Sequence, residues 1–456
     1  MGYFLIVMIA CASVGVLLFI MLFHFVVLSF VGMFTKKKYM GSDKKLKYGV
    51  IISARNEETV ISGLIESILR ADYPKDLIDI FVVAHNCTDA TADVCRKLGA
   101  FVYEYNNPKE CTVGYAYRHL FGKIKEDYGT DNYDGFLIMN ADNIITENYI
   151  EKMNDAFVSF SGRKIITSYR NSKNFSQNTM SCLYGIFFVA ACRFESRGRT
   201  VCGCSTRVSG TGYLIPSEYI SNGWDYVTLT EDWEFSADQI MQGHKVMYCD
   251  EAEFYDEQPT TMKIMLRQRL RWGKGHMDVF FTRFKPLVRS LFGRQKKERE
   301  KNGEKSSYSV YDIAVQILPL GVIGIFLWII QMALVAFSPL FGYDAAIVWL
   351  IYLIYFGICS GVGYTLTVLS AVFIFILERK RIGKVRFFTA LAAFLLWPCF
   401  LLVSVILDVY VLFIRKLEWK PIPHNHNVIV KKTSSINKTV TDTDLPTDKN
   451  IPAVTD

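Results

Sequence analysis

The stretch YGVIISARNEE, residues 48–58, decides the fold class of this chain. Residues 48–54 form a short apolar run rich in β-branched side chains, and the run stops at the polar residues 55–58. A run of this kind is typical of a buried β-strand that ends in a loop. The next residues, TVISGLIESIL at 59–69, carry apolar side chains at helical spacing. The sequence therefore predicts a strand, a polar loop and a helix in that order.

The same unit repeats along the chain. Further apolar runs are LIDIFVVA at 77–84, AFVYEY at 100–105 and YDGFLIM at 133–139. Strands that alternate with helical segments are typical of an α/β domain with a mostly parallel sheet. We expect this fold class for residues 45–260.

Three polar clusters follow three of these strands: RNEE at 55–58, HNCTD at 85–89 and NADN at 140–143. In open parallel sheets, ligands bind at the carboxyl ends of the strands. The clusters therefore predict one ligand site built from three strand ends. The first strand is followed by neither G-x-G-x-x-G nor a Walker-type loop, so the sequence does not support a dinucleotide site or a P-loop phosphate site.

Carboxylates and amides are ligands that Mg²⁺ and Mn²⁺ prefer. Asp142 is the best candidate ligand in NADN, although Asn and Asp also end strands as simple turns. The stretch TEDWEF at 230–235 has two interpretations. It is either the acidic first turn of a helix or the source of a general base.

The stretch MLRQRLRWGKGH at 265–276 is basic and amphipathic. It suits a helix that lies on anionic lipid, and the same helix can carry an active-site face. The net charge of the whole chain is +7. This charge concentrates near apolar blocks, and no nucleic-acid-binding motif is present. The eleven cysteines lack C-x-x-C pairs, so we expect reduced thiols.

Four apolar blocks are each long enough to cross a bilayer. The first, residues 3–34, precedes a lysine cluster, which predicts an uncleaved anchor and a cytoplasmic domain behind it. One anchor and three later spans would place the tail outside, whereas the basic residues 415–420 favour the inside. A broken segment at Pro398, or at Gly361 and Gly363, would resolve this conflict. The three later blocks are residues 313–340, 345–377 and 387–414.

Six motifs, SARNEE, HNCTDAT, NADN, SGTGYLIP, TEDWEF and QRLRW, occur in an order that resembles the membrane-embedded family 2 glycosyltransferases. These include synthases of cellulose, chitin, hyaluronan and poly-N-acetylglucosamine. The resemblance implies a GT-A-like nucleotide-sugar-binding domain inserted between transmembrane helices. The implied parts are an anchor at 1–34, a catalytic domain at 45–260, interfacial helices at 261–300, about three transmembrane helices at 313–414 and a disordered tail at 431–456.

The resemblance further implies an inverting transfer from a UDP-sugar to a growing β-linked polysaccharide, with Mg²⁺ or Mn²⁺ as cofactor. The enzyme would be a multi-pass protein of the cell membrane, in contact with lipid, with room for accessory secretion subunits. The implied site residues are Asp232 as general base; Glu57, Asp89 and Arg271 for the donor; Gln268, Trp272, Gly210 and Thr211 for the acceptor; and Asp142 and Asn140 for the metal.

This sequence departs from the family pattern at two places. Asn140 stands at the first position of the D-x-D motif. Ala84 and His85 replace an acidic pair whose second Asp often reads uracil in the family. His85 is expected either to face solvent or to contact the base. A single-transfer enzyme acting on a lipid-linked or membrane-bound acceptor is an alternative function. A catalytically silent membrane scaffold is a more remote one.

Overall fold

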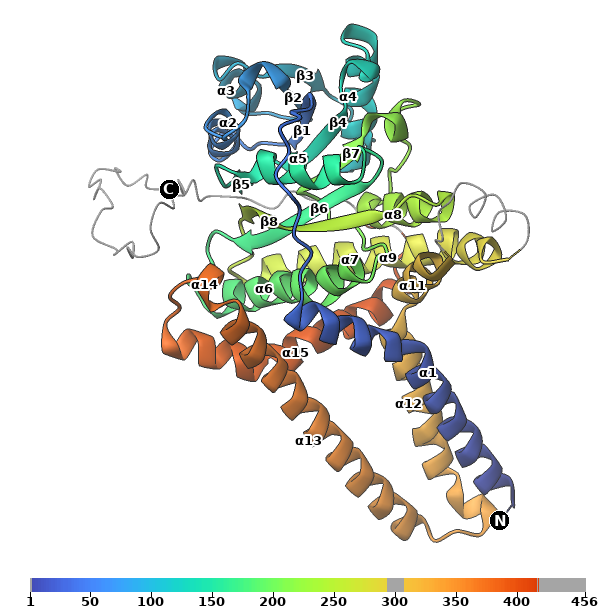
Figure 1. The fold of residues 1–456 in the computed structure, drawn as a ribbon. Helices are drawn as coiled ribbons and strands as arrows, with labels where there is room; N and C mark the ends of the chain where they lie inside the picture. Colours follow the sequence, from blue (N-terminus) through green and yellow to red (C-terminus); the bar gives the residue numbers. More distant parts are fainter. Residues whose placement is uncertain (1, 293–306, 416, 418–456) are drawn as a thin grey trace, which may run out of the picture.

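The computed structural model describes residues 2–292, 307–415 and 417, with side chains from Ser13 onward. An α/β domain lies at one end of the molecule, and long apolar helices extend from its base (Figure 1). The tail predicted to be disordered, residues 431–456, lies outside the described residues, as does the end of the predicted interfacial region, 293–300.

The domain is built on one eight-stranded sheet in the order β3-β2-β1-β4-β7-β6-β8-β5. The neighbours β3-β2-β1-β4 are parallel to one another, and so are β6 and β8. The mostly parallel sheet predicted from the sequence is therefore confirmed. The strands are β1 (Tyr48–Ala54), β2 (Ile78–His85), β3 (Phe101–Tyr105), β4 (Gly135–Asn140), β5 (Ile144–Ile145), β6 (Ile165–Ser172), β7 (Tyr213–Pro216) and β8 (Val246–Asp256).

Side chains of β1 alternate between two hydrophobic cores, one on each face of the sheet. Val50 and Ile52 pack with α2 and α5, whereas Ile51 packs with α4 and α8. Both faces are thus covered, which explains why the strand is apolar at nearly every position. The covering helices are α2 (Ile61–Leu69), α3 (Thr91–Lys97), α4 (Val113–Asp127), α5 (Tyr149–Ser159) and α8 (Glu231–Gln242).

The register of the central strands brings their carboxyl ends level with one another. Ala54 pairs with Ala84 across β1 and β2, and Ser53 pairs with Asn140 across β1 and β4. The three polar clusters that follow these strands therefore start from the same edge of the sheet.

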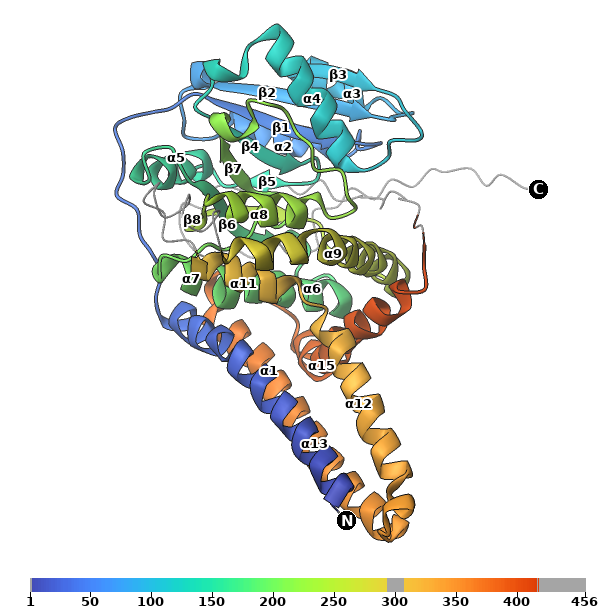
Figure 2. The same ribbon diagram turned by 90° about the vertical axis from the view of Figure 1, so that its right-hand side faces the viewer.

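A layer of helices separates the sheet from the apolar helices (Figure 2). Its longest member, α9 (Met262–Ser290), carries the QRLRW motif. Asn178 caps α6 through a reciprocal capping box with Ser181. The other members are α6 (Thr179–Ala190), the π-helix η3 (Ala191–Arg197), α7 (Gly198–Val201) and α11 (Ser307–Ile317). Short 3₁₀ turns elsewhere are η1 (Lys75–Leu77), η2 (Thr130–Asn132), η4 (Ser217–Ile220) and η5 (Ser338–Phe341).

Three helices are each long and apolar enough to cross a membrane: Ser13–Phe34 of α1, α13 and α15. The pair α11 and α12 would be a fourth span, but it is bent by 57°. The bounds of the helices not yet given are α1 (Gly2–Phe34), α12 (Leu320–Ala336), α13 (Ala345–Leu377), α14 (Arg379–Ile382) and α15 (Phe387–Val411).

The place predicted for a broken segment was wrong. α13 continues through Gly361 and Gly363, and α15 continues through Pro398. The break lies instead at Pro319, between α11 and α12. Proline lacks the backbone N–H that a helix interior needs, so it readily ends one helix and starts another. Within apolar helices, neighbouring groups satisfy the freed carbonyl and the chain can remain helical, as around Pro398.

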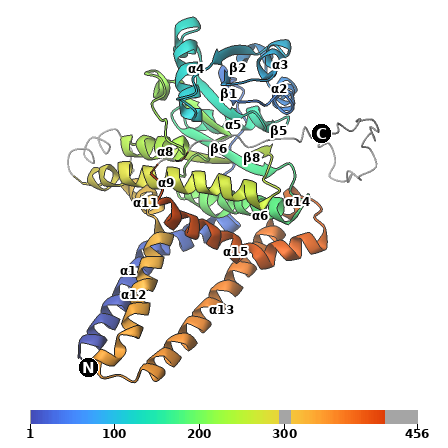
Figure 3. The ribbon, with the colours of Figure 1, turned by 180° about the vertical axis from the view of Figure 1, so that it is seen from behind.

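The four apolar helices do not run in the same direction. Helices α1, α12 and α13 extend away from the domain, whereas α15 lies across its base beneath α6 and α9 (Figures 1 and 3). Arg269 of α9 fastens α15 there, since its Nη1 donates to the Phe400 carbonyl oxygen at 2.7 Å. The region predicted to hold three transmembrane helices therefore contains one helix, α15, that packs against α6 and α9.

Buried ion pairs join the apolar helices to the domain. Asp250 of β8 accepts hydrogen bonds from Arg197 Nε at 3.0 Å and from Arg381 Nη2 at 3.0 Å. Arg381 lies in the short helix that directly follows α13. Burial alone would raise the pKa of Asp250, but Arg381 and Arg197 hold it below its ordinary value. The carboxylate is therefore charged when folded, and it fixes the domain end of α13.

Candidate active site

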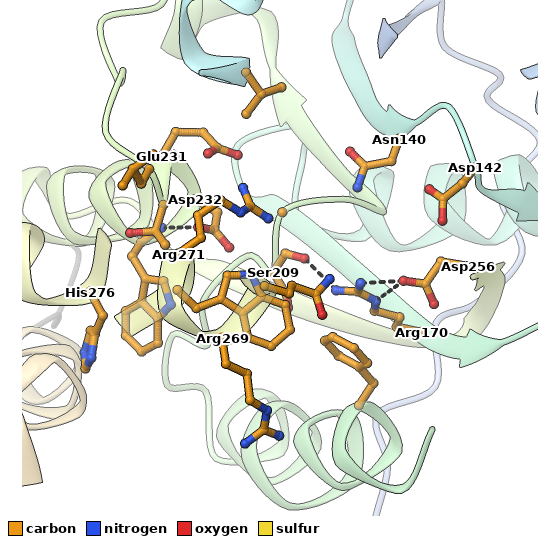
Figure 4. A pocket seen from close by; sticks show the side chains of 18 of the residues that line it. Asn140, Asp142, Arg170, Ser209, Glu231, Asp232, Asp256, Arg269, Arg271 and His276 are labelled. Carbon is orange, nitrogen blue, oxygen red and sulfur yellow. Dashed lines mark hydrogen bonds and ion pairs between the residues drawn. The ribbon is translucent and has the colours of Figure 1, made fainter. Parts of the chain in front are cut away.

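A cavity of about 390 Å³ lies where the carboxyl ends of β1, β2 and β4 face α9 (Figure 4). Its sheet side is lined by Arg55, Glu57, His85, Asn140 and Asp142. All three strand-end clusters thus contribute to one site, as the sequence predicted. Its other walls come from the loop before β7, the start of α8, and helices α6, α9 and α15.

Both carboxylate oxygens of Asp142 accept hydrogen bonds, which fix its position after β4. Its Oδ2 accepts from the Glu257 backbone N–H at 3.0 Å, and its Oδ1 accepts from Asn143 Nδ2 at 3.2 Å. The backbone N–H of Asn140 donates to Asn143 Oδ1 at 3.0 Å. Asn143 therefore braces the turn so that the side chains of Asn140 and Asp142 lie side by side (Figure 4).

An ion pair that the sequence did not suggest lies next to Asp142. Arg170 donates from Nε to Asp256 Oδ2 at 2.7 Å and from Nη1 to the Ser209 carbonyl oxygen at 3.1 Å. Its guanidinium lies 3.5 Å from the ring centroid of Phe188. Arg170 thus ties the end of β8 to the loop before β7, across the cavity (Figure 4).

The chemistry of this corner fits a divalent cation. The pKa of Asp256 is raised to about 6. Burial is the main cause, and the charge of Asp142 adds to it, whereas Arg170 opposes the shift. Negative charge is therefore crowded here. Among the described residues, no group of three His, Cys, Asp or Glu side chains is placed to hold a metal. Asp142 and Asn140 could supply two oxygen ligands, and a bound diphosphate would supply others.

Two neighbouring acids, Glu231 and Asp232, begin α8 on the opposite side of the cavity (Figure 4). Burial and then the charge of Asp232 raise the pKa of Glu231 to about 8. Burial also raises the pKa of Asp232, but Arg207 and Arg271 oppose the shift. The shift of Glu231 therefore favours a proton on this side chain near pH 7. Asp232 Oδ1 accepts from the Trp233 N–H at 2.9 Å.

Gln268, Arg271 and Trp272 of the QRLRW motif all line the cavity. Burial lowers the pKa of Arg271, but Glu231 and Asp232 oppose this shift. Gln268 Oε1 is buried without a hydrogen-bond partner among the described residues. The Trp272 ring stacks on Phe187 with centroids 6.3 Å apart and planes 19° apart. The motif therefore presents a cation, an amide and an aromatic ring to one space.

Gly210 also lines the cavity, but two other predicted site residues do not. Thr211 is buried and its hydroxyl bonds Asn143 Oδ1 and the Asn140 N–H. Asp89 accepts from the Thr91 N–H at 3.1 Å and from the Glu58 N–H at 3.2 Å. Both side chains are occupied in holding loops together. Their sequence motifs are adjacent to the site, but local hydrogen bonds turn these two side chains away from it.

His85 is only 2% exposed, so the expectation that it faces solvent was wrong. Its Nε2 lies 2.7 Å from the Glu110 carbonyl oxygen, and its ring stacks on Tyr105. Burial is the main reason that its pKa is lowered to about 4, so the ring is neutral near pH 7. His85 therefore offers the cavity a neutral ring where an acid was expected.

Several lining residues were not predicted as site residues. Arg55, Glu231 and Arg269 lie inside the quoted motifs but not at the positions that the family pattern marks, and the others lie outside every motif. Asp408 carried one usable signal, since a lone acid in an apolar block is costly and often functional. Arg170 carried no such signal, because β6 (IITSYRNS) is largely polar apart from its first residues. Among the lining residues not predicted are Arg55, Arg170, Arg207, Glu231, Asp256, Arg269, His276, Ser404 and Asp408.

Three comparisons place this chain among known proteins. The model of the family described as "Glycosyltransferase like family 2" matches residues 46–275, half of the chain. A probable glycosyltransferase, YdaM of Bacillus subtilis, is 23% identical over 248 residues, which cover 53% of this chain and 59% of that protein. The poly-beta-1,6-N-acetyl-D-glucosamine synthase of Staphylococcus aureus is 22% identical over 276 residues, covering 58% and 61% of the two chains.

The beta-monoglucosyldiacylglycerol synthase of Synechocystis is 22% identical over 253 residues, covering 54% of this chain and 51% of that protein. The matches thus span between 51% and 61% of the length of these relatives. Among solved structures, the mannosyltransferase PcManGT of Pyrobaculum calidifontis covers 82% of this chain and 97% of its own, with a TM-score of 0.49 and 13% identity.

Proposed function

The chain belongs to glycosyltransferase family 2, and on that premise we propose that it transfers a sugar from a UDP-sugar to a β-linked glycan at a membrane, with inversion. The observation that carries this proposal is the arrangement around one cavity. Asp232 lies opposite Asn140 and Asp142, and Arg271 lies between them (Figure 4). A base and a diphosphate site that face each other are what a single displacement needs.

In the proposed reaction, the oxygen of an acceptor hydroxyl attacks the anomeric carbon, and Asp232 accepts the proton of that hydroxyl. The bond from that carbon to the diphosphate breaks on the opposite face. Negative charge then builds on the leaving diphosphate, and Arg271 is placed to stabilise it. Glu231 holds its own proton, so it leaves Asp232 as the basic carboxylate. Asp142 and Asn140 would hold a Mg²⁺ or Mn²⁺ ion, which would neutralise diphosphate charge when bound.

For the donor, we propose UDP-N-acetylglucosamine first and UDP-glucose second. The names of two relatives support these two sugars, a poly-N-acetylglucosamine synthase and a monoglucosyldiacylglycerol synthase. We propose Glu57 and Arg271 as donor-binding residues. Asp89 would act on the donor through the loop that it braces. Gln268, Trp272 and Gly210 would face the acceptor, with Thr211 supporting them from behind.

A polysaccharide is the acceptor that we propose, and a single transfer to a membrane-bound acceptor is the second candidate. The position of α15 favours the second candidate, since this helix lies beneath the cavity on the side of the apolar helices. An acceptor anchored in lipid would approach the cavity along α15. Accessory secretion subunits are needed only for the polymer.

We propose a membrane orientation with three crossings, made by α1, the α12 segment and α13. Lys36–Lys38 follow α1, and Arg379–Arg381 follow α13, so both basic clusters lie at the domain end of these helices. Positive flanks favour the cytoplasmic side, which places the domain there. With α15 lying along the interface, the basic residues from Arg415 also fall inside, and the topological conflict disappears. The proposed domain division is otherwise that expected from the sequence.

The test is UDP release by the purified full chain in detergent, with Mn²⁺ or Mg²⁺ and a panel of UDP-sugars. Wild type is compared with Asp232→Asn and with the control Asp238→Asn, on the same helix but outside the cavity lining. We expect metal-dependent release with one sugar, lost in Asp232→Asn and kept in the control. A high-mass product would identify a synthase, and a short or lipid-linked product the single-transfer enzyme. No release with any donor would favour a silent scaffold.

A further inference from the structure

Helix α15 carries a single charged side chain, Asp408, among the apolar residues of Phe387–Val411. An acid in such a helix is expensive and usually faces a polar space or a partner. Asp408 lines the same cavity as Asp232 and Gln268, and none of the described residues forms a hydrogen bond or ion pair with it. Its position therefore calls for a function that the base and the diphosphate site do not explain.

Gly273 allows Asp408 to reach the cavity. A Cβ atom at position 273 would stand 2.6 Å from Asp408 Oδ1, closer than any real contact. Trp272, Gly273 and Asp408 all line the one cavity. Helices α9 and α15 thus present an aromatic ring and a carboxylate to the same space.

Ser404 lies one turn before Asp408 and lines the same cavity. Residues four apart share a face of a helix, so α15 presents both side chains together. Arg269 holds this face in place, because it hydrogen-bonds Ser404 Oγ and the Phe400 carbonyl. Arg269 is 3% exposed, yet its Nε and Nη2 have no hydrogen-bond partner among the described residues. The wall therefore keeps unused donors and acceptors.

We propose that Asp408 and Ser404, with Gln268, form the subsite that binds the acceptor glycan, a proposal that rests on the proposed glycosyl transfer. A carboxylate accepts from two sugar hydroxyls, or from an amide or amine N–H, at once. The rings of Trp272 and Phe187 offer apolar surface beside it. The sheet edge provides the donor end of the cavity, and α9 and α15 provide the opposite wall.

The charge of Asp408 selects the class of acceptor. A phosphate or carboxylate on the acceptor would be repelled by Asp408, since neither group carries a proton to share near pH 7. Arg269 lies in the same wall, but its Nη1 already donates to the Phe400 carbonyl oxygen and to Ser404 Oγ. The subsite therefore suits a neutral or amino-bearing glycan end rather than an anionic one.

The test measures donor and acceptor separately in the detergent-solubilised full chain. Donor use is UDP release from UDP-N-acetylglucosamine with water as acceptor, and acceptor use is transfer to chitotetraose at varied concentration. Asp408→Asn should raise the KM for chitotetraose about tenfold or more, as expected when hydrogen bonds to a charged group are lost. Donor KM and UDP release into water should stay within about twofold, by the same reasoning.

Three further variants make the test specific. Gly273→Ala pushes a methyl group against Asp408 and should raise the acceptor KM even if Asp408→Asn folds poorly. Asp408→Glu keeps the carboxylate and should retain more acceptor binding than Asp408→Asn. Tyr410→Phe alters an exposed side chain of the same helix and should behave like wild type. Equal acceptor KM values in wild type and Asp408→Asn, or equal losses for donor and acceptor, would overturn the proposal.

Calorimetric binding of chitotetraose, with an oligosaccharide of hyaluronan as the anionic probe, separates this inference from the proposed function. Suppose that chitotetraose binds, that binding depends on Asp408, and that the chain releases no UDP. This outcome would support the acceptor subsite and reject the proposed glycosyl transfer. Normal UDP release together with chitotetraose binding that ignores Asp408 would support the transfer and reject the subsite. Tighter binding of the anionic probe by wild type would also reject the subsite.

Discussion

Arg170 Nε lies 2.7 Å from Asp256 Oδ2, and this buried pair links the end of β8 to the donor corner of the cavity. Each residue belongs to a different strand, and Asp142 lies close enough to raise the pKa of Asp256. The pair balances charge at the place where a diphosphate and a cation are proposed to bind. Its energetic role can be measured directly.

Replacing Arg170 by Ala leaves Asp256 buried without its cation. Removing one partner of a buried pair costs about 3–5 kcal/mol of the free energy of unfolding. We expect Arg170→Ala to lower the thermal midpoint of the detergent-solubilised chain. The double variant Arg170→Ala/Asp256→Asn removes the stranded charge and should recover part of the loss. A double variant no more stable than the single one would contradict this account.

The activity should depend on pH through Asp232. Burial raises its pKa above the ordinary value, and the group must be ionised to act as a base. The kcat/KM of transfer should therefore rise with pH along an acid limb whose midpoint lies above about 4, where an unperturbed Asp titrates. A pH–rate profile of UDP release measures this limb. A flat profile from pH 4 to 7 would remove Asp232 from the role of base.

We expect Glu231 to lower the free energy of unfolding as the pH rises. Its pKa is raised from 4.5 to about 8 in the folded chain, so the folded state binds its proton more tightly than the unfolded state does. The stability it contributes is complete below about pH 4.5 and is lost as pH rises towards 8. Thermal unfolding should show Glu231→Gln gaining stability over wild type at pH 8 but not at pH 5. Equal pH dependence of the two proteins would contradict the shift.

We expect Gly210 to matter in two ways: its backbone adopts a left-handed conformation, and a side chain at this position would lie beside Asp232. Its φ is +74°, and a Cβ there would stand 3.7 Å from Asp232 Oδ2. Gly210→Ala should cost about 1–2 kcal/mol of backbone strain and place a methyl group in van der Waals contact with Asp232 inside the cavity, where it displaces acceptor or water, so kcat should fall. Gly203→Ala is the matched control, because its φ is +71° and a Cβ there meets nothing within 4 Å. The two variants should lose similar stability, and only Gly210→Ala should lose turnover.

We expect Asp89 to stabilise the loop that it belongs to and Glu57 to contribute to donor binding. Asp89 is occupied by the N–H groups of Thr91 and Glu58, whereas Glu57 lines the cavity. Asp89→Ala should cost about 1 kcal/mol of stability, because the hydrogen bonds from the Thr91 and Glu58 N–H groups are lost. Glu57→Gln should raise the KM for the UDP-sugar at unchanged stability. A larger rise in donor KM for Asp89→Ala than for Glu57→Gln would reverse this assignment.

Residues that follow directly from strand ends were predictable. Asp142 and Glu57 come just after buried strands, and parallel strands of one sheet end at one edge, so local pattern alone brings them together. Asp89 was also close in sequence to that edge, but its side chain bonds its own loop. Such a choice between a local hydrogen bond and the cavity depends on side-chain geometry that a motif does not contain.

The sequence by itself determined the alternation of strands and helices, the family motifs and the apolar blocks, because these are periodic or local patterns. Only the tertiary structure decided that Arg170 meets Asp256, that Asp408 packs against Gly273, and that α15 lies across the base of the domain. These contacts join segments far apart in the chain. They depend on how whole helices pack, and packing is set by the shapes of both surfaces at once rather than by either segment alone.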